Sequence, residues 1–220
     1  MSIAVFFATV SLGLAGETKW SKGKGYVALP ASGCPAQPLF GYKHFKQLNV
    51  MSGCSSPAGE RRSWGVFRGG APTADGVACL GTGFHVSAVF DLRSEGETGT
   101  TERKAAEERG LLYYNFPMAT DSNVPSESCK SAGLSATQCN RKAVTSAIDE
   151  MERLLSIDPA ANIYVHCARG EDRTGLVIGL FRVLKEGCLK ADARQEMREY
   201  GYTAYSQLKA VWDELTASAP

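Results

Sequence analysis

The chain has 220 residues, of which 44% are hydrophobic and 21% are charged, and its formal net charge is +1. This composition excludes a disordered chain, a coiled coil and a repeat array, and the length suffices for one domain with a full hydrophobic core. The charge is uneven, because eight basic and two acidic residues lie between Glu17 and Gly70. Such a stretch can gather an anionic substrate or face a membrane or nucleic acid. Scattered solvated lysines explain it equally well, and no nucleic-acid motif accompanies it.

The first residues have the pattern of an export signal. An uncharged apolar run from Ile3 to Ala15 is too short to cross a bilayer and ends with small residues where a signal peptidase reads them. We therefore expect a signal peptide over 1–15, export to the periplasm or the medium, and no stable membrane insertion after its removal. No basic residue precedes the run, so a buried or interfacial segment of a cytoplasmic protein is the alternative.

Residues 16–60 are rich in Gly, Ser, Pro and Lys and show little periodicity, which predicts an irregular N-terminal arm. A folded domain is expected over 61–220. Strand patterns occur at 63–68, 86–92, 111–118 and 162–166. Helix patterns occur at 73–80, at 102–109, from 141 onward, and at 174–186, 192–200 and 203–217. Because strands and helices alternate, we expect a single α/β domain whose central, mostly parallel twisted sheet is flanked by helices.

Seven cysteines occur, and six of them suffice for three disulfides in an oxidising compartment once one reactive thiol is set aside. The seven are Cys34, Cys54, Cys79, Cys129, Cys139, Cys167 and Cys188. Proximity in sequence favours Cys129–Cys139 and Cys34–Cys54, which leaves Cys79–Cys188. The alternative is that several of them are small buried hydrophobic residues.

The segment from His166 to Gly175 lies between a predicted strand and a strongly apolar helix. Backbone N–H groups at such a junction point inward and, with the helix dipole, form an anion site. Arg173 can offer a planar fork of donors to two phosphate oxygens. The backbone of the loop would complete the phosphate site through Ala168, Arg169, Gly170, Glu171, Asp172 and Arg173.

A thiol at the mouth of this site, that of Cys167, should have a pKa below its ordinary value and be a thiolate at neutral pH. It would attack phosphorus and form a phosphocysteine, while the loop and Arg173 hold the oxygens on which transition-state charge spreads. Thr174 could donate a hydrogen bond to the sulfur and help it leave in the second step.

The run His166-Cys167 followed by Arg173-Thr174-Gly175 resembles the signature of the protein tyrosine phosphatase superfamily. Val66–Thr73 and Phe90–Glu95 resemble its compact dual-specificity branch, so the likeness spans roughly 63–215. The resemblance implies a dual-specificity-phosphatase-like fold, a phosphatase domain over 61–220 and a supporting role for His166. Asp91 and Arg93 are expected to form an ion pair within the fold.

The mechanism of that superfamily also needs a carboxylic acid on a loop before the helix that precedes the signature. Asp121 follows a predicted strand inside the long polar stretch 119–138, so we expect it to be the general acid. Glu127 and Asp172 are the rivals.

The expected activity is hydrolysis of phosphomonoesters, on phosphotyrosine and other aryl phosphates or on inositol polyphosphates. The latter are substrates of an exported, phytase-like bacterial group, which the signal, the cysteines and the basic arm fit. Glu171 and Asp172 make the loop less basic than that of phosphoinositide phosphatases. A pseudophosphatase that only binds phosphate and a rhodanese-like sulfurtransferase are the alternatives. His44, His85 and His166 lack ligand spacing, so no metal, cofactor or nucleic-acid partner is expected.

Overall fold

The computed structural model describes residues 46–48, 65–94, 97–98, 100–120 and 127–219. Its centre is a sheet of five strands in the order β1-β2-β5-β3-β4. The strands are β1 (Lys46–Leu48), β2 (Gly65–Gly69), β3 (Val86–Asp91), β4 (Leu112–Asn115) and β5 (Asn162–His166). β2, β5, β3 and β4 are parallel to one another, and β1 pairs with β2 in the antiparallel direction. The predicted α/β class and mostly parallel sheet are therefore confirmed.

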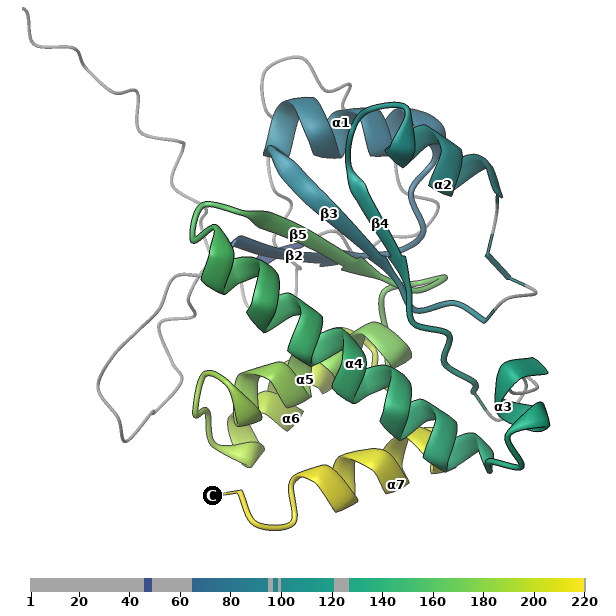
Figure 1. Cartoon of the computed structure of the whole chain (residues 1–220). Coiled ribbons are helices and arrows are strands. Elements are labelled where there is room, and N and C mark those ends of the chain that lie inside the picture. The colour runs from purple at the N-terminus through teal and green to yellow at the C-terminus, as the bar shows by residue number, and fades with distance from the viewer. Residues whose placement is uncertain (1–45, 49–64, 95–96, 99, 121–126, 220) are drawn as a thin grey trace, which may run out of the picture.

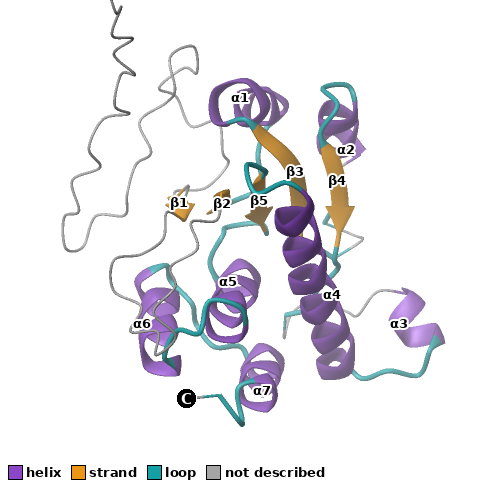
Figure 2. Ribbon diagram, turned by 60° about the vertical axis from the view of Figure 1, so that its left-hand side comes forward, coloured by secondary structure: helices purple, strands orange, loops and turns teal. Residues whose placement is uncertain are grey.

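Helices cover both faces of the sheet (Figures 1 and 2). They are α1 (Ala74–Phe84), α2 (Thr100–Glu107), α3 (Glu127–Ser131), α4 (Ala136–Ile157), α5 (Asp172–Leu184), α6 (Lys190–Glu199) and α7 (Ser206–Leu215). Figure 2 shows α1 and α2 on one side and α4 to α7 on the other. The period-2 alternation of strands sends Ile163 and Val165 of β5 into the larger core under α4–α7, and Tyr164 into the smaller core under α1 and α2.

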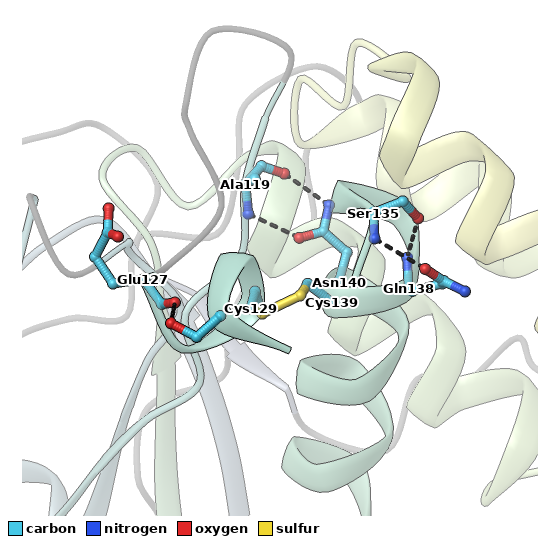
Figure 3. Close-up of a disulfide and its surroundings, with 8 residues drawn as sticks. Ala119, Glu127, Cys129, Ser135, Gln138, Cys139 and Asn140 are labelled. Carbon is cyan, nitrogen blue, oxygen red and sulfur yellow. Dashed lines mark hydrogen bonds between the residues drawn. A yellow bond between two sulfur atoms is a disulfide. The ribbon is translucent and has the colours of Figure 1, made fainter. Parts of the chain in front are cut away.

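Two segments predicted to be irregular contain regular structure. β1 lies inside the predicted arm and continues the sheet beyond β2. The polar stretch 119–138 holds α3 and the start of α4, which begins five residues before the apolar periodicity at 141. Its start is fixed by a capping box, in which the Ser135 hydroxyl accepts from the Gln138 N–H and the Gln138 side chain accepts from the Ser135 N–H (Figure 3). Apolar periodicity misses such a polar first turn.

A disulfide joins α3 to the first turn of α4, between Cys129 and Cys139 (Figure 3). This is the pair that spacing favours. Cys79 and Cys188 are also disulfide-bonded, yet none of the disulfides between described residues joins them to each other, so the predicted Cys79–Cys188 pair is wrong. The two residues belong to opposite sides of the sheet, since Cys79 is in α1 and Cys188 follows α5. The predicted Cys34–Cys54 pair lies outside the described residues.

Next to this disulfide, Asn140 holds the chain that leaves β4. Its side-chain amide donates to the Ala119 carbonyl at 2.8 Å and accepts from the Ala119 N–H at 2.7 Å (Figure 3). Both groups are buried, so each bond satisfies a polar atom that would otherwise be costly to bury. Consecutive residues of α4 thus anchor both flanks of 121–126, Asn140 on the upstream side and Cys139 on the downstream side.

Replacing Cys129 and Cys139 together by alanine should lower the free energy of unfolding by up to about 3 kcal/mol. The bridge spans a sequence separation of 10 and restricts the unfolded chain, and without it α3 keeps little to hold it to α4. Urea unfolding of the double variant and the wild type, both without reductant, measures the difference. Equal transition midpoints would contradict a stabilising effect of the Cys129–Cys139 bridge.

Across the described helices, none has both the length and the apolar character needed to cross a membrane. The predicted signal peptide over 1–15 lies outside the described residues.

Candidate active site

The loop 167–171 follows the carboxyl end of β5, between the parallel neighbours β2 and β3, and leads directly into α5. Chain segments after both neighbours bind it. The Ala71 N–H donates to the Ala168 carbonyl at 3.2 Å, and the Leu92 N–H donates to the His166 carbonyl at 2.9 Å. In α/β sheets this edge, outside the carboxyl ends of the strands, is where ligands bind. The helix begins at Asp172, two residues before the predicted start, so Arg173 and Thr174 lie in its first turn.

Cys167 has the only free thiol among the described cysteines, and its side chain is buried. The Gly170 N–H points at its sulfur, with 3.3 Å between Gly170 N and Cys167 Sγ. Burial by itself raises the pKa of the thiol, but the charge of Arg173 and hydrogen bonds from the loop outweigh it, so the pKa lies below its ordinary value. The geometry fits the nucleophile that the sequence predicts.

Thr174 is fully buried beside Cys167, and its hydroxyl also lowers the pKa of the thiol. Its Oγ1 makes no hydrogen bond of regular geometry within the described structure. We therefore attribute most of the lowering to Arg173 and the backbone N–H groups.

Arg173 is held by a carboxylate that the sequence analysis missed. Its Nη1 donates to Glu97 Oε2 at 2.5 Å and its Nη2 to Glu97 Oε1 at 3.1 Å, and Nη1 also approaches the Met118 carbonyl at 3.3 Å. Burial alone would raise the pKa of Glu97, but the bonds and charge of Arg173 lower it to about 2. Glu97 follows β3, at the same edge of the sheet as the loop. That position is the signal that could have identified it.

The other charged residues of the loop are neutralised close by. Arg169 pairs with Glu171 at 3.1 Å and approaches Asp172 at 3.8 Å. Asp172 is buried and accepts hydrogen bonds from the backbone N–H and the hydroxyl of Thr203, at 2.7 and 2.8 Å. These contacts make it a structural residue that ties α5 to the turn before α7 and leave it poorly placed to protonate a leaving group.

Glu127, the second rival for the general acid, is exposed at the start of α3 and pairs with Lys130. Asp121 lies outside the described residues. The chain that leads to it is described up to Thr120, whose side chain is buried.

Gly170 allows the loop to pass close to β2. It has a φ of +77°, and a Cβ at this position would lie 2.4 Å from the Gly69 carbonyl carbon. Both the left-handed backbone and the contact exclude a side chain.

Gly170→Ala should therefore lower the free energy of unfolding by more than about 2 kcal/mol, the cost of the left-handed conformation plus a backbone clash. Gly110→Ala is the matched control, because Gly110 has a φ of +71° but open space around its missing Cβ. It should cost only about 1 kcal/mol. Urea unfolding compares the two variants, and equal losses would contradict the close approach of the loop to β2.

His166 belongs to a buried charged cluster behind the loop. Its Nε2 lies 2.7 Å from Glu102 Oε1, and Arg93 donates to Asp91 at 2.7 Å and to Glu102 at 2.5 Å. Burial lowers the pKa of His166, but Glu102 and Asp91 outweigh it and raise the pKa above its ordinary value. The predicted pairing of Asp91 with Arg93 is present. Glu102, which the sequence suggests to be a surface residue, is buried.

Asp91, Glu102 and His166 also place one potential ligand atom each within 4.8 Å of the others. The Arg93 guanidinium already binds both carboxylates and supplies the positive charge that a metal ion would bring. The cluster is thus better described as an ion-pair network than as a metal centre.

Comparison with known proteins agrees with this geometry. Residues 52–217 match the tyrosine phosphatase family, whereas no curated protein matches the chain in sequence. The active form of Tk-PTP is similar in structure, with a TM-score of 0.55 and 17% identity, over 74% of this chain and 98% of that one. PTPMT1 is similar with a TM-score of 0.50 and 17% identity, over 69% of this chain and 92% of that one. These structures share the fold, and the family match covers most of the chain. The protein therefore belongs to the tyrosine phosphatase family and is a hydrolase of phosphoric monoesters.

Proposed function

We propose that the protein hydrolyses phosphomonoesters through a phosphocysteine intermediate on Cys167. The observation that carries this proposal is the placement of a free thiol of lowered pKa in the loop between β5 and α5. The Gly170 N–H is directed at its sulfur, and Arg173 lies in the first turn of α5. Backbone N–H groups and a guanidinium around one point suit a tetrahedral oxyanion.

In the first step the thiolate of Cys167 attacks phosphorus, so that a P–S bond forms as the bond from phosphorus to the leaving oxygen breaks. The leaving oxygen takes a proton from the general acid. In the second step water attacks phosphorus, its proton returns to that acid, and the P–S bond breaks to release phosphate and the thiolate. The loop N–H groups and Arg173 bind the oxygens on which charge spreads in both transition states.

We assign the general acid to Asp121. The support is indirect, because Asp172 is committed to Thr203 and Glu127 to Lys130. The chain just before Asp121 lies at the site, where the Met118 carbonyl contacts Arg173.

Asp121→Asn should lower kcat for substrates with poor leaving groups by about 10²-fold or more. For p-nitrophenyl phosphate, whose leaving group needs little protonation, the loss should be smaller. Steady-state assays on phenyl phosphate and p-nitrophenyl phosphate give the two values. An equal loss on both substrates, or none on either, would assign the proton transfer to another residue.

Among substrates we favour aryl phosphates such as phosphotyrosine over inositol polyphosphates. The support is that the one exposed arginine of the loop, Arg169, is already paired with Glu171 and Asp172. The described part of the site thus offers little positive charge for additional phosphate groups. A panel of phosphotyrosine peptide, inositol hexakisphosphate and phosphoinositides at equal concentration orders the three classes by kcat/KM.

The decisive test is direct detection of the intermediate. Rapid acid quench of the wild type with p-nitrophenyl phosphate, followed by peptide mass spectrometry, should locate one phosphoryl group on Cys167. Hydrolysis without any adduct on this residue, or a wild type inert on every phosphoester, contradicts the proposal. A persulfide on Cys167 would point to sulfur transfer instead.

We further propose that the protein is exported. Cys129, Cys139, Cys79 and Cys188 are disulfide-bonded, and such bonds persist in oxidising compartments. N-terminal sequencing of protein secreted or released from the periplasm should begin at Gly16. A cytoplasmic product that retains Met1 contradicts export but leaves the proposed chemistry intact.

A further inference from the structure

Arg68 is a fully buried arginine directly beneath the catalytic loop. Its exposed fraction is 0%, and it is among the largest buried side chains of the protein. It comes from β2, on the face that packs toward α4–α7, since its neighbours Val66 and Phe67 belong to the larger and the smaller core, respectively. A buried arginine is costly unless its charge and its donors are satisfied. Its partners therefore show what it does.

The first partner is the loop itself. Arg68 Nη2 donates to the Gly170 carbonyl at 2.9 Å and lies 3.7 Å from the position where a Cβ of Gly175 would be, in the first turn of α5. Gly170 is also the residue whose N–H points at the Cys167 sulfur. Arg68 thus holds the residue that contacts the nucleophile.

This hydrogen bond also fixes a second loop amide. The Gly170 carbonyl and the Glu171 N–H belong to one peptide group, which is trans because the described residues contain no cis peptide bond. In a trans peptide the C=O and the N–H point in opposite directions. With the carbonyl held toward the buried Arg68, the Glu171 N–H points away from Arg68, the direction that the proposed anion site requires.

The charge of Arg68 is only partly balanced by carboxylates. Its nearest one is Glu196, at 3.9 Å from Nη1 to Oε1, and Glu196 makes its shorter contact with Arg182 at 2.9 Å. Nε and Nη1 of Arg68 have no hydrogen-bond partner in the described structure, and the guanidinium rests on the Tyr200 ring at 3.9 Å. A cation–π contact offsets part of the cost of burial, but it does not supply a counter-charge.

Arg68 is nevertheless a cation at neutral pH. Burial lowers its pKa to about 10, which leaves it protonated, and the Cys167 thiolate and Glu196 favour the charged form. The electrostatic attraction between Arg68 and the thiolate acts in both directions. Among the described residues, Arg173 of α5 also interacts electrostatically with the thiolate, and so does Tyr164 of β5, whose hydroxyl donates to the Gly70 carbonyl.

We propose that Arg68 is a positioning residue of the active site, which orients the Gly170–Glu171 peptide for anion binding and adds a second positive charge beneath the thiolate and the bound phosphate. The inference rests on the proposed function, because it assumes that Cys167 is the nucleophile. Arg68 does not touch the substrate. The carboxylates around Arg68 balance its positive charge only in part, and the thiolate and the bound phosphate balance the rest.

The test compares Arg68→Gln, which removes the charge, with Arg68→Lys, which keeps it. The pH dependence of Cys167 alkylation by iodoacetamide measures the thiol pKa, and protection by inorganic phosphate measures phosphate affinity. Arg68→Gln should raise the thiol pKa by about 1 unit and weaken phosphate binding about tenfold. Arg68→Lys should keep the thiol pKa within about half a unit of the wild type. If both variants fold and keep the wild-type thiol pKa, Arg68 is only structural and the inference is overturned.

A second variant should shift the thiol pKa in the opposite direction, and it remains informative if Arg68→Gln does not fold. Glu196→Gln removes the partial counter-charge of Arg68, so the thiol pKa should fall and phosphate should bind more tightly. Glu186→Gln is the matched control, because among the described residues Glu186 forms an ion pair with Arg182 and none with Arg68, and it should leave both values unchanged. A thiol pKa that is unchanged or higher in Glu196→Gln overturns the inference. A wild type with an ordinary thiol pKa and no phosphatase activity overturns the proposed function as well.

Discussion

Cys167→Ser should reduce kcat/KM on p-nitrophenyl phosphate by at least about 10⁴-fold, as removal of a covalent nucleophile does in other hydrolases. A serine hydroxyl in the same place stays protonated at neutral pH, since Arg173 and the loop N–H groups that stabilise a thiolate cannot lower the pKa of an alcohol far enough. The groups expected to bind the anion are Arg173 and the loop N–H groups, and serine is close to cysteine in size, so we expect the site and the fold to persist. The loss should therefore appear in kcat, while the protein remains folded.

Phosphate binding by the same variant distinguishes loss of chemistry from loss of the site. The thiolate is a negative charge beside a bound anion, so its removal should leave the affinity for inorganic phosphate unchanged or higher. Isothermal titration calorimetry on Cys167→Ser and the wild type at pH 7 gives this comparison. Retained activity in Cys167→Ser would exclude the phosphocysteine route. Lost phosphate binding would mean that the serine has collapsed the loop.

The sequence predicts the features of this protein that depend on local pattern. The strand 162–166, the apolar helix after it and the loop between them follow from alternation, helical periodicity and the spacing of Cys167 and Arg173. Apolar periodicity predicts that this helix starts at Thr174, whereas it starts at Asp172. An error of two residues is common at helix ends. These local rules also locate the edge of the sheet at which the site lies, because parallel strands bring their carboxyl ends together.

The supporting charges could not be predicted in the same way. Glu97, Glu102 and Arg68 are 76, 64 and 99 residues distant from Arg173, His166 and Cys167 in the chain. The local sequence around each of them predicts an ordinary solvent-exposed charge. Only the packing of β2, β3 and α2 around the loop makes them partners of the site, where Arg68 and Glu102 are buried and Glu97 is partly buried. Similarly, the sheet separates the elements that carry Cys79 and Cys188, so these two cysteines do not bond to each other. The spacing of cysteines in the sequence gives no information on this separation.

The arrangement of charges around Arg173 explains why a lysine could not replace it. Two nitrogens of the guanidinium are bound to Glu97, and one of them also contacts the Met118 carbonyl, so the orientation of the planar group is fixed before an anion arrives. The remaining N–H donors are those available to phosphate. A lysine has one compact ammonium, which can satisfy the carboxylate or the anion but not both in a fixed geometry.

Arg173→Lys should accordingly lower kcat/KM by about 10³–10⁴-fold, more than the loss of a single donor to a developing oxyanion. It should also raise the thiol pKa of Cys167, because the charge that lowers it is drawn toward Glu97. Arg153→Lys, a conservative change on the exposed face of α4 where Arg153 pairs with Glu150, should change neither quantity. Steady-state kinetics and the pH dependence of alkylation measure both.

Replacing Glu97 tests this explanation, because the expected change in kcat/KM has opposite signs in the wild type and in the Arg173→Lys variant. In the wild type, Glu97→Gln removes the carboxylate that orients Arg173 and should lower kcat/KM about tenfold, the loss of one charge-assisted hydrogen-bonded pair. In the Arg173→Lys background the same change should raise kcat/KM, because it releases the ammonium from Glu97 to the bound phosphate. Losses that simply add would show that Glu97 acts independently of the guanidinium. An opposite sign in the two backgrounds requires that the effect of the carboxylate depends on the cation at the start of α5, since that cation is the only residue that differs between them.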